Sequence, residues 1–207
     1  MKLKVSVILL MIGIMLAGCG SEEQSTGDTG RFQESSNEST KERTEERTEE
    51  RTKESTEEAA PYILTFEATT TEGETITSDC LADSKLTMIN VWATYCNPCL
   101  MEMPDLGEIA AEYDKSEFQI LGIVSDVTTE DGQESVDYAK ELIEETKADY
   151  PHLLLNESLY VNLVGGTSAV PTTFFVKQDG EVLGYVVGAN TKEGWVELIN
   201  QLLAEIE

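Results

Sequence analysis

The sequence predicts an α/β domain with a central mixed β-sheet, helices on both faces of that sheet and a short strand pair at its N-terminal end. Three observations support this fold class. The nearly unbroken apolar run 86–92 has the length of a strand that is buried on both faces. Helical and strand patterns alternate after it, as in parallel sheets. Asp179-Gly180 then separates two β-type segments and predicts an antiparallel hairpin.

Strands are expected where β-branched, aromatic and other apolar residues run together between turn residues. These segments are 61–66, 74–77, 86–92, 118–124, 152–155, 173–177 and 181–187. Glu72-Gly73 separates the first two, which are expected to form the short N-terminal pair.

Helices are expected where apolar residues recur at intervals of three and four. The positions that mark them are Met103, Leu106, Ala110 and Tyr113 in the first helix, Val136, Ala139, Ile143 and Thr146 in the second, and Trp195, Leu198, Ile199, Leu202 and Ile206 in the last. A shorter helix is expected over 158–164, before Gly165-Gly166. These elements together have the size of one ordinary domain, which is predicted to extend over 61–207.

The sequence Cys96-Asn97-Pro98-Cys99 lies between the central strand and the first helix. Two cysteines at this spacing can close a small disulfide, and the helix terminus stabilises a thiolate on the first of them. Cys96 is therefore expected to be the attacking sulfur. Cys99, one turn inside the helix, is expected to be more buried and to resolve the mixed disulfide. Pro98 fits the first helical turn, where its missing N–H costs nothing.

The residues around this motif resemble the thioredoxin superfamily, and most closely its membrane-tethered TlpA/ResA-type thiol-disulfide oxidoreductases. The resemblance extends over 61–207. It depends on 91–99, which reads Val-Trp-Ala-Thr-Tyr-Cys-Asn-Pro-Cys, and on 170–175, which reads Val-Pro-Thr-Thr-Phe-Phe, with Asp179-Gly180 after it. A strand before the C-x-x-C, a helix after it and the later Val-Pro-Thr make this joint signal much more specific than the motif alone. The resemblance implies a thioredoxin-like fold.

The resemblance also implies a substrate-binding surface beside the two sulfurs. Pro171 is expected to have a cis peptide bond, and the backbone of Val170 to receive an extended substrate; a trans proline at a strand edge is the alternative. The side chains expected to line this surface are Trp92, Tyr95, Asn97 and Pro98. Tyr95 stands where the superfamily more often has tryptophan, and Asn97 where the ResA type has Glu. These differences affect partner preference and reduction potential.

Glu102 lies three residues after Cys99 and therefore on the same helical face. It matches the Glu that follows the motif in ResA-type proteins, where a carboxylate near the cysteines is thought to help handle protons. A partly buried carboxylate has a raised pKa and can exchange a proton with Cys99 during resolution. The expected catalytic residues are thus Cys96, Cys99 and Glu102. The alternative is that Glu102 faces solvent.

The resemblance implies an enzyme that reduces disulfides or oxidised cysteines of exported proteins. A membrane thiol-electron carrier would reduce the disulfide that forms, and by family analogy the clients are an apocytochrome c or a methionine sulfoxide reductase. No cofactor is expected. One alternative is a disulfide-forming oxidant or isomerase, which uses the same residues. Another is a surface-displayed binding lipoprotein whose disulfide is inert.

Residues 1–18 have the pattern of an export signal. Lys2 and Lys4 precede an apolar run that is too short for a comfortable membrane span. The run ends in Leu-Ala-Gly-Cys at 16–19, which resembles the bacterial lipoprotein signal. Cys19 is therefore expected to carry a diacyl lipid that anchors the protein to the outer face of the cell membrane. An ordinary secretory signal with an incidental cysteine is the alternative.

Residues 19–60 are expected to form the lipidated cysteine and a disordered charged tether. Almost nothing in this segment is apolar, and 40–55 repeats a four-residue unit rich in charge. A single charged helix is the alternative, but a period of four would stack Arg43, Arg47 and Arg51 on one face.

The chain has a formal net charge of −26, and 59–207 contains 27 acidic and 6 basic residues. This balance argues against binding of nucleic acid and against electrostatic adhesion to anionic lipid, so the lipid must provide the anchor. A basic partner would be steered toward the protein. The alternative is a surface that is charged for solubility alone.

Neither Cys80 nor His152 is expected to take part in the thiol-disulfide chemistry. Cys80 is the thiol left over when Cys96 and Cys99 pair, and it is expected to be a buried small hydrophobe or an idle thiol. A regulatory partnership with Cys96 or Cys99 is the alternative. His152 is the only histidine, and it is expected to lie on the surface or in the core with its hydrogen bonds made. No metal site is predicted, because a metal carrier would need more ligands.

Overall fold

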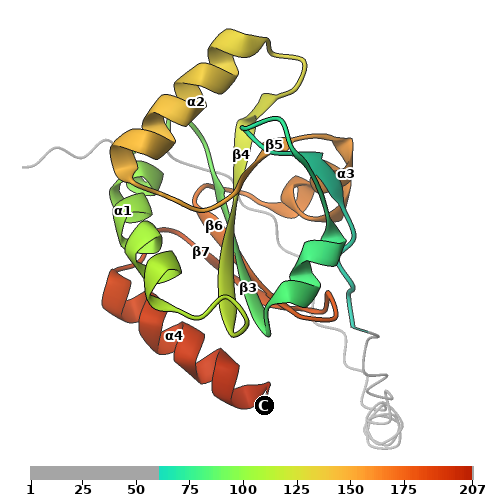
Figure 1. Cartoon of the computed structure of the whole chain (residues 1–207), viewed down its shortest axis with the longest axis vertical. Coiled ribbons are helices and arrows are strands. Elements are labelled where there is room, and N and C mark those ends of the chain that lie inside the picture. The colour runs from blue at the N-terminus through green and yellow to red at the C-terminus, as the bar shows by residue number, and fades with distance from the viewer. Residues whose placement is uncertain (1–60, 207) are drawn as a thin grey trace, which may run out of the picture. The chain divides into compact units, whose positions relative to one another are not determined.

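The computed structural model describes residues 61–206, and its main sheet has five strands in the order β5-β4-β3-β6-β7 (Figure 1). The strands are β3 Leu86–Trp92, β4 Phe118–Thr128, β5 His152–Leu155, β6 Thr172–Lys177 and β7 Val182–Val187. β4 runs parallel to β3 and β5, whereas β6 runs antiparallel to β3 and β7. The predicted mixed sheet is confirmed.

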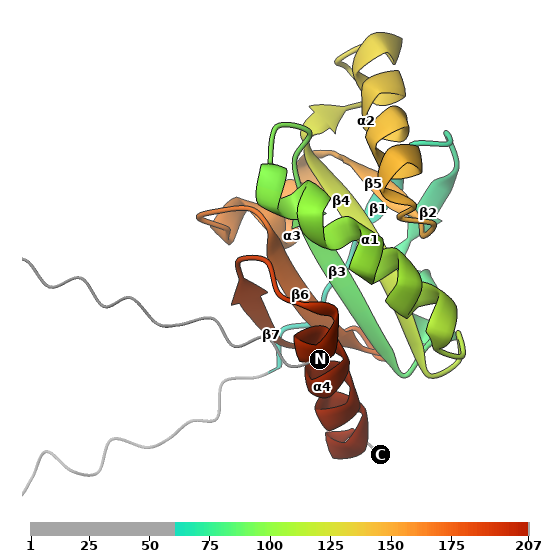
Figure 2. The same cartoon turned by 90° about the vertical axis from the view of Figure 1, so that its left-hand side faces the viewer.

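Helices cover both faces of this sheet, as predicted. One face carries α1 Asn97–Glu112, α2 Gln133–Thr146 and α4 Lys192–Glu205. The other carries α3 Glu157–Asn162 together with the N-terminal strands. Figure 2 shows α1 and α4 in front of the sheet and α3 behind it. Among residues 61–206, no helix combines the length and the apolar character needed to cross a membrane.

β3 is central because its side chains are buried on both faces. Ile89 and Val91 pack in the apolar cluster under α3, whereas Leu86 and Met88 pack against α1 and α4. This two-sided burial is the reason that the strand reads as an apolar run rather than as an alternating pattern. Asn90 is a polar exception and lies on the α1 side of the strand, between Met88 and Trp92.

The N-terminal strand pair is present, but its first strand begins later than predicted. The strands are β1 Glu67–Thr69 and β2 Thr75–Thr77, and they pair antiparallel. The earlier residues lie against the turn between β6 and β7, where Ile63 forms a bridge with Glu181. Leu64 and Phe66 are buried in the cluster under α3. The apolar pattern of 61–66 therefore reflects the burial of Leu64 and Phe66, not pairing with 74–77.

Smaller differences concern the ends of elements. β4 continues four residues beyond the predicted 118–124. The helix expected over 158–164 is divided into α3 and a short 3₁₀ turn, Val164–Gly166, and Asn156 caps α3 by accepting a hydrogen bond from the Leu159 amide. The signal segment, Cys19 and the proposed tether lie outside the described residues.

Gly122 provides the space for His152 between β4 and β5. The two residues are partners in the strand register, and a Cβ at Gly122 would lie 2.1 Å from His152 Nδ1. The ring is held in place, because Nδ1 accepts a hydrogen bond from Trp92 Nε1 at 3.1 Å. We expect Gly122→Ala to lower the free energy of unfolding by about 2–3 kcal/mol.

Chemical denaturation measures this loss, with Gly184→Ala as the control. Gly184 also lies in the sheet, but a Cβ there meets no atom within 4 Å. Equal losses in the two variants would mean that the His152 ring moves aside and that the contact is not restrictive.

Candidate active site

The two motif cysteines form a disulfide at the start of α1, with their Cα atoms 5.3 Å apart. Cys96 is the N-cap residue, and its Sγ accepts a hydrogen bond from the Cys99 amide at 3.3 Å. Cys99 is fully buried, whereas Cys96 keeps 6% of its surface exposed. After reduction, Cys96 is thus the sulfur that a partner can reach, and the helix N-terminus favours its thiolate. The prediction that Cys99 is the more buried of the two is confirmed.

The segment before β6 lies beside this disulfide. The Val170–Pro171 peptide bond is cis, as the resemblance implies. β6 pairs with β3, so Pro171 is next to the end of the strand that leads to the motif. Val170 is half-buried and packs against the apolar cluster that contains Cys96 and Cys99. The cis proline and the two sulfurs, about seventy residues apart in the sequence, are therefore brought together.

Exposed side chains surround the entrance to the disulfide. Tyr95 is 75% exposed, and Asn97 and Pro98 are also exposed. Met101, which the sequence analysis did not select, is 79% exposed one turn further along α1. It follows Cys99 by two residues, so its place on the exposed side of α1 could have been read from the helical period.

Trp92 does not belong to this surface, contrary to the expectation that it lines the substrate site. It is fully buried, and its Nε1 donates a hydrogen bond to His152 Nδ1. The reason is its place in β3, where the alternation of side chains turns it into the core beneath α1 and α2. Trp92 therefore packs in the buried cluster beneath the two cysteines and does not contact the solvent.

Glu102 is buried, and the alternative in which it faces solvent is wrong. Only 3% of its surface is exposed. Its Oε1 accepts a hydrogen bond from Asn90 Nδ2 at 3.1 Å, and its Oε2 accepts from the Asn190 amide at 3.1 Å and from Trp195 Nε1 at 3.4 Å. Burial raises the pKa of the carboxyl group above its usual range, although these three donors oppose the shift.

The sequence analysis connected none of the three donors with Glu102. The sequence could have indicated Asn90 as the partner of another buried polar group, because an amide in the middle of a buried strand requires a polar partner. Nothing in the sequence around Asn190 and Trp195 indicates that they lie near Glu102. They reach Glu102 only because the start of α4 packs against α1, a contact between residues about ninety positions apart.

Asp126 holds the loop that leads to Cys96. Its carboxylate, near the end of β4, accepts hydrogen bonds from the Thr94 amide at 3.0 and 3.1 Å and from Thr94 Oγ1 at 2.6 Å. β3 and β4 are parallel, so their carboxyl ends meet at the same edge of the sheet. That rule could have identified Asp126 as a neighbour of the motif, but the sequence analysis did not select it.

His152 is a core residue with both ring nitrogens in hydrogen bonds, which confirms one of the two expectations for it. Nε2 lies 3.1 Å from the Ala148 carbonyl, and Nδ1 accepts from Trp92. Burial lowers the pKa of the ring to about 4, so it is neutral at physiological pH. The Tyr150 ring stacks on it, with centroids 4.5 Å apart. Burial and the nearby Glu102 raise the pKa of Tyr150.

Cys80 is a half-buried free cysteine that packs against the cluster under α3. Burial, together with the negative charge of Asp83, raises the pKa of its thiol to about 11. Cys80 is therefore protonated at neutral pH and a weak nucleophile. This agrees with the expectation of an idle thiol.

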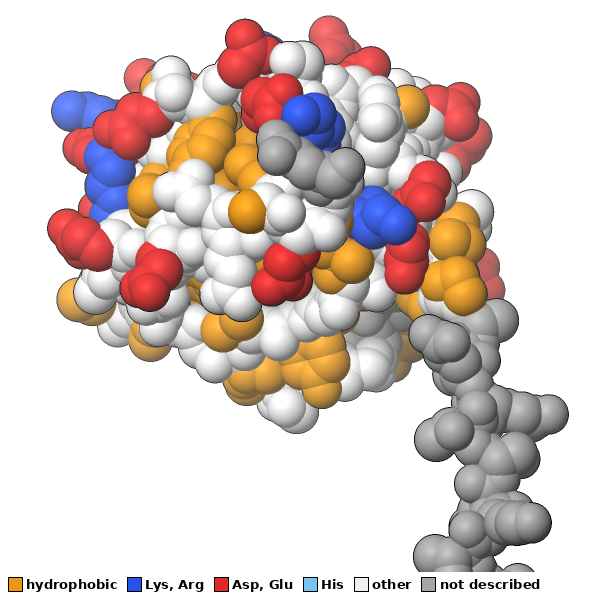
Figure 3. Space-filling model, turned by 90° about the horizontal axis from the view of Figure 1, so that it is seen from below, with side chains coloured by type: hydrophobic (Ala, Val, Ile, Leu, Met, Phe, Trp, Pro, Cys, Tyr) orange, Lys and Arg blue, Asp and Glu red, His pale blue; other side chains and the backbone are white. Residues whose placement is uncertain are grey.

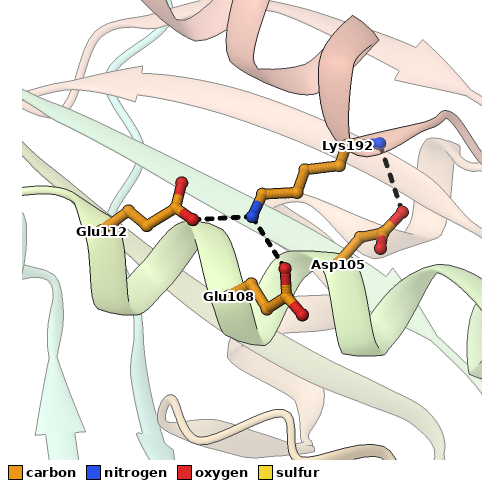
Figure 4. Close-up of polar contacts among 4 residues, drawn as sticks. All are labelled: Asp105, Glu108, Glu112 and Lys192. Atoms are coloured by element: carbon orange, nitrogen blue, oxygen red, sulfur yellow. Dashed lines mark hydrogen bonds and ion pairs between the residues drawn. The ribbon is translucent and has the colours of Figure 1, made fainter.

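Lys192 fastens the start of α4 to α1 (Figure 4). Its Nζ lies 2.7 Å from Glu108 Oε2 and 2.7 Å from Glu112 Oε1, and its backbone amide donates to Asp105 Oδ2 at 3.2 Å. The bonds to the two glutamates raise the pKa of Lys192. These bonds lie beside residues 190–195, which carry two of the three hydrogen-bond donors of Glu102 and whose Trp195 packs in the buried cluster with α1.

The described surface is strongly acidic. Figure 3 shows acidic side chains distributed over one face, among hydrophobic and uncharged groups. The lysines that form ion pairs with carboxylates are Lys85, Lys140, Lys177 and Lys192. Their pairing leaves the excess negative charge uncompensated.

Comparison with known proteins places this site in a family context. A profile of the AhpC/TSA family matches residues 57–184. The thiol-disulfide oxidoreductase ResA of Oceanobacillus iheyensis is 31% identical over 122 residues, which make up 58% of this chain and 58% of the relative. The thiol:disulfide interchange protein HelX of Rhodobacter capsulatus is 30% identical over 124 residues, 60% of this chain and 64% of the relative. The chain thus spans less than two thirds of the length of these curated relatives.

Solved structures show the same fold. A thioredoxin-family thiol:disulfide interchange protein from Chlorobium tepidum has a TM-score of 0.59 at 23% identity, over 70% of this chain and 98% of its own. The exposed lipoprotein thioredoxin of Streptococcus pneumoniae has a TM-score of 0.53 at 23% identity, over 66% of this chain and 98% of its own. The expected thioredoxin-like fold is confirmed.

Proposed function

The chain belongs to the AhpC/TSA family, and from this membership and the geometry of the site we propose that it is a thiol-disulfide oxidoreductase that reduces other proteins. One observation carries the proposal. A disulfide at the start of α1 joins a reachable Cys96 to a buried Cys99, beside a cis proline. The proposal is also supported by the curated relatives ResA and HelX, which are named as a thiol-disulfide oxidoreductase and a thiol:disulfide interchange protein.

The reaction begins with both cysteines reduced. The Cys96 thiolate attacks one sulfur of a client disulfide, which breaks that S–S bond and releases the other client sulfur as a thiolate. Cys99 then loses its proton and attacks Cys96 Sγ. The Cys96–Cys99 bond forms, the bond to the client breaks, and the client leaves with two electrons more than it brought. A thiol-electron carrier must supply two electrons to restore the dithiol.

Glu102 is proposed to take the proton from Cys99. Cys99 is fully buried, so its thiol has no direct access to water as a base. Glu102 lies one helical turn away, and its raised pKa brings it closer to the range in which a carboxyl group exchanges protons near neutral pH. It is thus suited to be the base that activates the resolving cysteine.

The client is proposed to bind over the exposed surface around Cys96. Tyr95, Asn97, Pro98 and Met101 would contact its side chains, and Val170 its backbone. Exported proteins with oxidised cysteines, of the apocytochrome c or methionine sulfoxide reductase type, are the proposed clients. The acidic surface would favour a basic client through faster encounter.

We also propose that the protein works outside the cytoplasm, held on the membrane by a lipid on Cys19. The support comes from the sequence around that cysteine and from the structural neighbour named as an exposed lipoprotein. A membrane thiol-electron carrier then becomes the natural reductant. Metabolic labelling with a fatty acid, compared between the natural chain and Cys19→Ala, tests the anchor.

The direction of electron flow is tested by the reduction potential. Equilibration of the Cys96–Cys99 pair with glutathione buffers of known ratio is expected to give a potential more negative than that of the glutathione couple. A potential well above it would support the alternative, an oxidant or isomerase. A pair that does not equilibrate at all would favour the binding lipoprotein with an inert disulfide.

A further inference from the structure

Asn90 is a fully buried residue in the central strand β3. Its side-chain amide faces α1, the helix that carries Cys99 and Glu102. Its Nδ2 donates to Glu102 Oε1 at 3.1 Å and to Thr173 Oγ1 at 3.0 Å. Thr173 is the partner of Asn90 in the register of β3 and β6 and is also fully buried. Asn90 Oδ1 has no hydrogen-bond partner among the described residues. Both donors of the amide are therefore used and its acceptor is not.

The hydrogen-bond partners of Glu102 suit only its ionised form, although its burial disfavours the charge. In the described part of the chain, its hydrogen-bond partners are the amide of Asn90, the backbone N–H of Asn190 and the indole N–H of Trp195. All three donate. A protonated Glu102 is itself a donor, and a buried O–H group without an acceptor costs about 1–3 kcal/mol.

Asn90 is the one partner of Glu102 that can change from donor to acceptor. Rotation of its amide by half a turn exchanges Oδ1 and Nδ2. Oδ1 would then lie at hydrogen-bond distance from Glu102 Oε1 and Thr173 Oγ1, whereas Nδ2 would take the present place of Oδ1, where no partner lies among the described residues. The rotated amide is therefore the less stable form unless Glu102 is protonated. The threonine hydroxyl can donate as well as accept, so it can follow the change. Neither the backbone N–H of Asn190 nor the indole of Trp195 has this freedom.

We propose that Asn90 is a positioning residue that lets Glu102 change its protonation state, by donating to the carboxylate and, after rotation of the amide, accepting from the carboxyl group. The inference rests on the proposed role of Glu102 as the base for Cys99. When Glu102 takes the proton of Cys99, the new O–H bond finds an acceptor in Asn90. When the proton leaves, the amide turns back.

No other side chain among the described residues offers Glu102 a hydrogen-bond acceptor at hydrogen-bond distance. The titratable groups that interact with it electrostatically are Asp105 on α1 and Tyr150 before β5. Cys99 precedes Glu102 by three residues on α1. Asp105 accepts a hydrogen bond from the Lys192 amide, and Tyr150 Oη has no hydrogen-bond partner among the described residues. α4 and β6 contribute the neutral groups of Trp195 and Thr173.

An NMR titration of the reduced full chain, labelled with ¹³C and ¹⁵N, tests the proposal. The Glu102 carboxyl carbon and the Asn90 side-chain amide are expected to titrate with one common midpoint. The NOE between the Asn90 Nδ2 protons and the Thr173 methyl group should weaken several-fold on the acidic side of that midpoint. In Glu102→Gln the Asn90 amide should no longer respond to pH. A carboxyl group that titrates while this NOE keeps its intensity would overturn the inference alone.

The same titration separates failure of the inference from failure of the proposed proton role. A Glu102 carboxyl group that does not titrate between about pH 4 and pH 10 would overturn both. Kinetics give an independent readout, because Asn90→Leu should slow resolution by Cys99 about tenfold and change attack by Cys96 less than about twofold. Thr87→Val, which removes a buried hydroxyl from the same strand, should change neither step. Equal slowing of both steps in Asn90→Leu would indicate a structural role only.

Discussion

Replacement of Cys99 by serine is expected to leave client proteins attached to Cys96 as stable mixed disulfides. Cys99 resolves such a complex because it is held next to Cys96 at the start of α1, with the two Cα atoms 5.3 Å apart. Intramolecular attack at such proximity has a very large effective concentration. Without it, release depends on thiols from solution and should slow by about two orders of magnitude or more. Non-reducing gels and mass spectrometry of complexes isolated from cells would identify the clients.

Two variants make this result interpretable. Cys96→Ser keeps the buried cysteine but removes the reachable one, so it should capture nothing. Cys80→Ser should behave like the natural protein, because the Cys80 thiol is half-buried and has a raised pKa. Recovery of no client with Cys99→Ser, under conditions in which the protein is exported, would count heavily against the proposed reductase.

Glu102→Gln is expected to slow the resolution step about a hundredfold while attack by Cys96 keeps its rate. The reason is that glutamine cannot take the proton of Cys99. The two steps can be separated by rapid mixing of the reduced protein with a peptide disulfide that carries a fluorophore. In the natural protein the resolution rate should rise with pH through the raised pKa of Glu102, and in the variant this rise should disappear. Unchanged resolution in Glu102→Gln would exclude Glu102 as the base.

The same variant has an effect on stability that depends on pH. The pKa of Glu102 is raised in the folded state, so the folded protein binds this proton more tightly than the unfolded chain. The natural protein therefore loses stability as the pH rises from about 4.3, the usual value of a glutamate, through the higher folded value. Glu102→Gln should lack this loss. Glu108→Gln on the same helix should keep it, because the pKa of Glu108 is lowered by Lys192.

The central part of the fold could be predicted because local sequence and final environment agree there. The run 86–92 is apolar throughout since both of its faces are buried, and the C-x-x-C begins a helix that Pro98 and the N-cap residue favour. The first strand could not be placed correctly. The pattern of 61–66 predicts burial, but it carries no information on which backbone the segment pairs with, and the turn near Gly180 provides that partner.

The residues of the candidate site also differ in how far the sequence could predict them. Cys96 and Cys99 could be selected from the sequence because two cysteines at this spacing, at the start of a helix, can by themselves form a reversible disulfide. The burial of Glu102 depends on Asn190 and Trp195, which are distant in the sequence, so the helical period predicted only its face. Trp92 shows the reverse error, since its position next to the motif suggested contact with the client while the alternation along β3 places it in the core.

The contact between residues 190–195 and Glu102 has a consequence for the order in which the chain is made. The cysteines are synthesised long before α4, yet two of the three groups that hold the Glu102 carboxylate come from the start of that last helix. A nascent or truncated chain that ends before it would carry both thiols without the Glu102 carboxyl group in its final setting. The hydrogen-bonded setting of the Glu102 carboxylate is therefore complete only after residues 190–195 have been synthesised and have packed against α1.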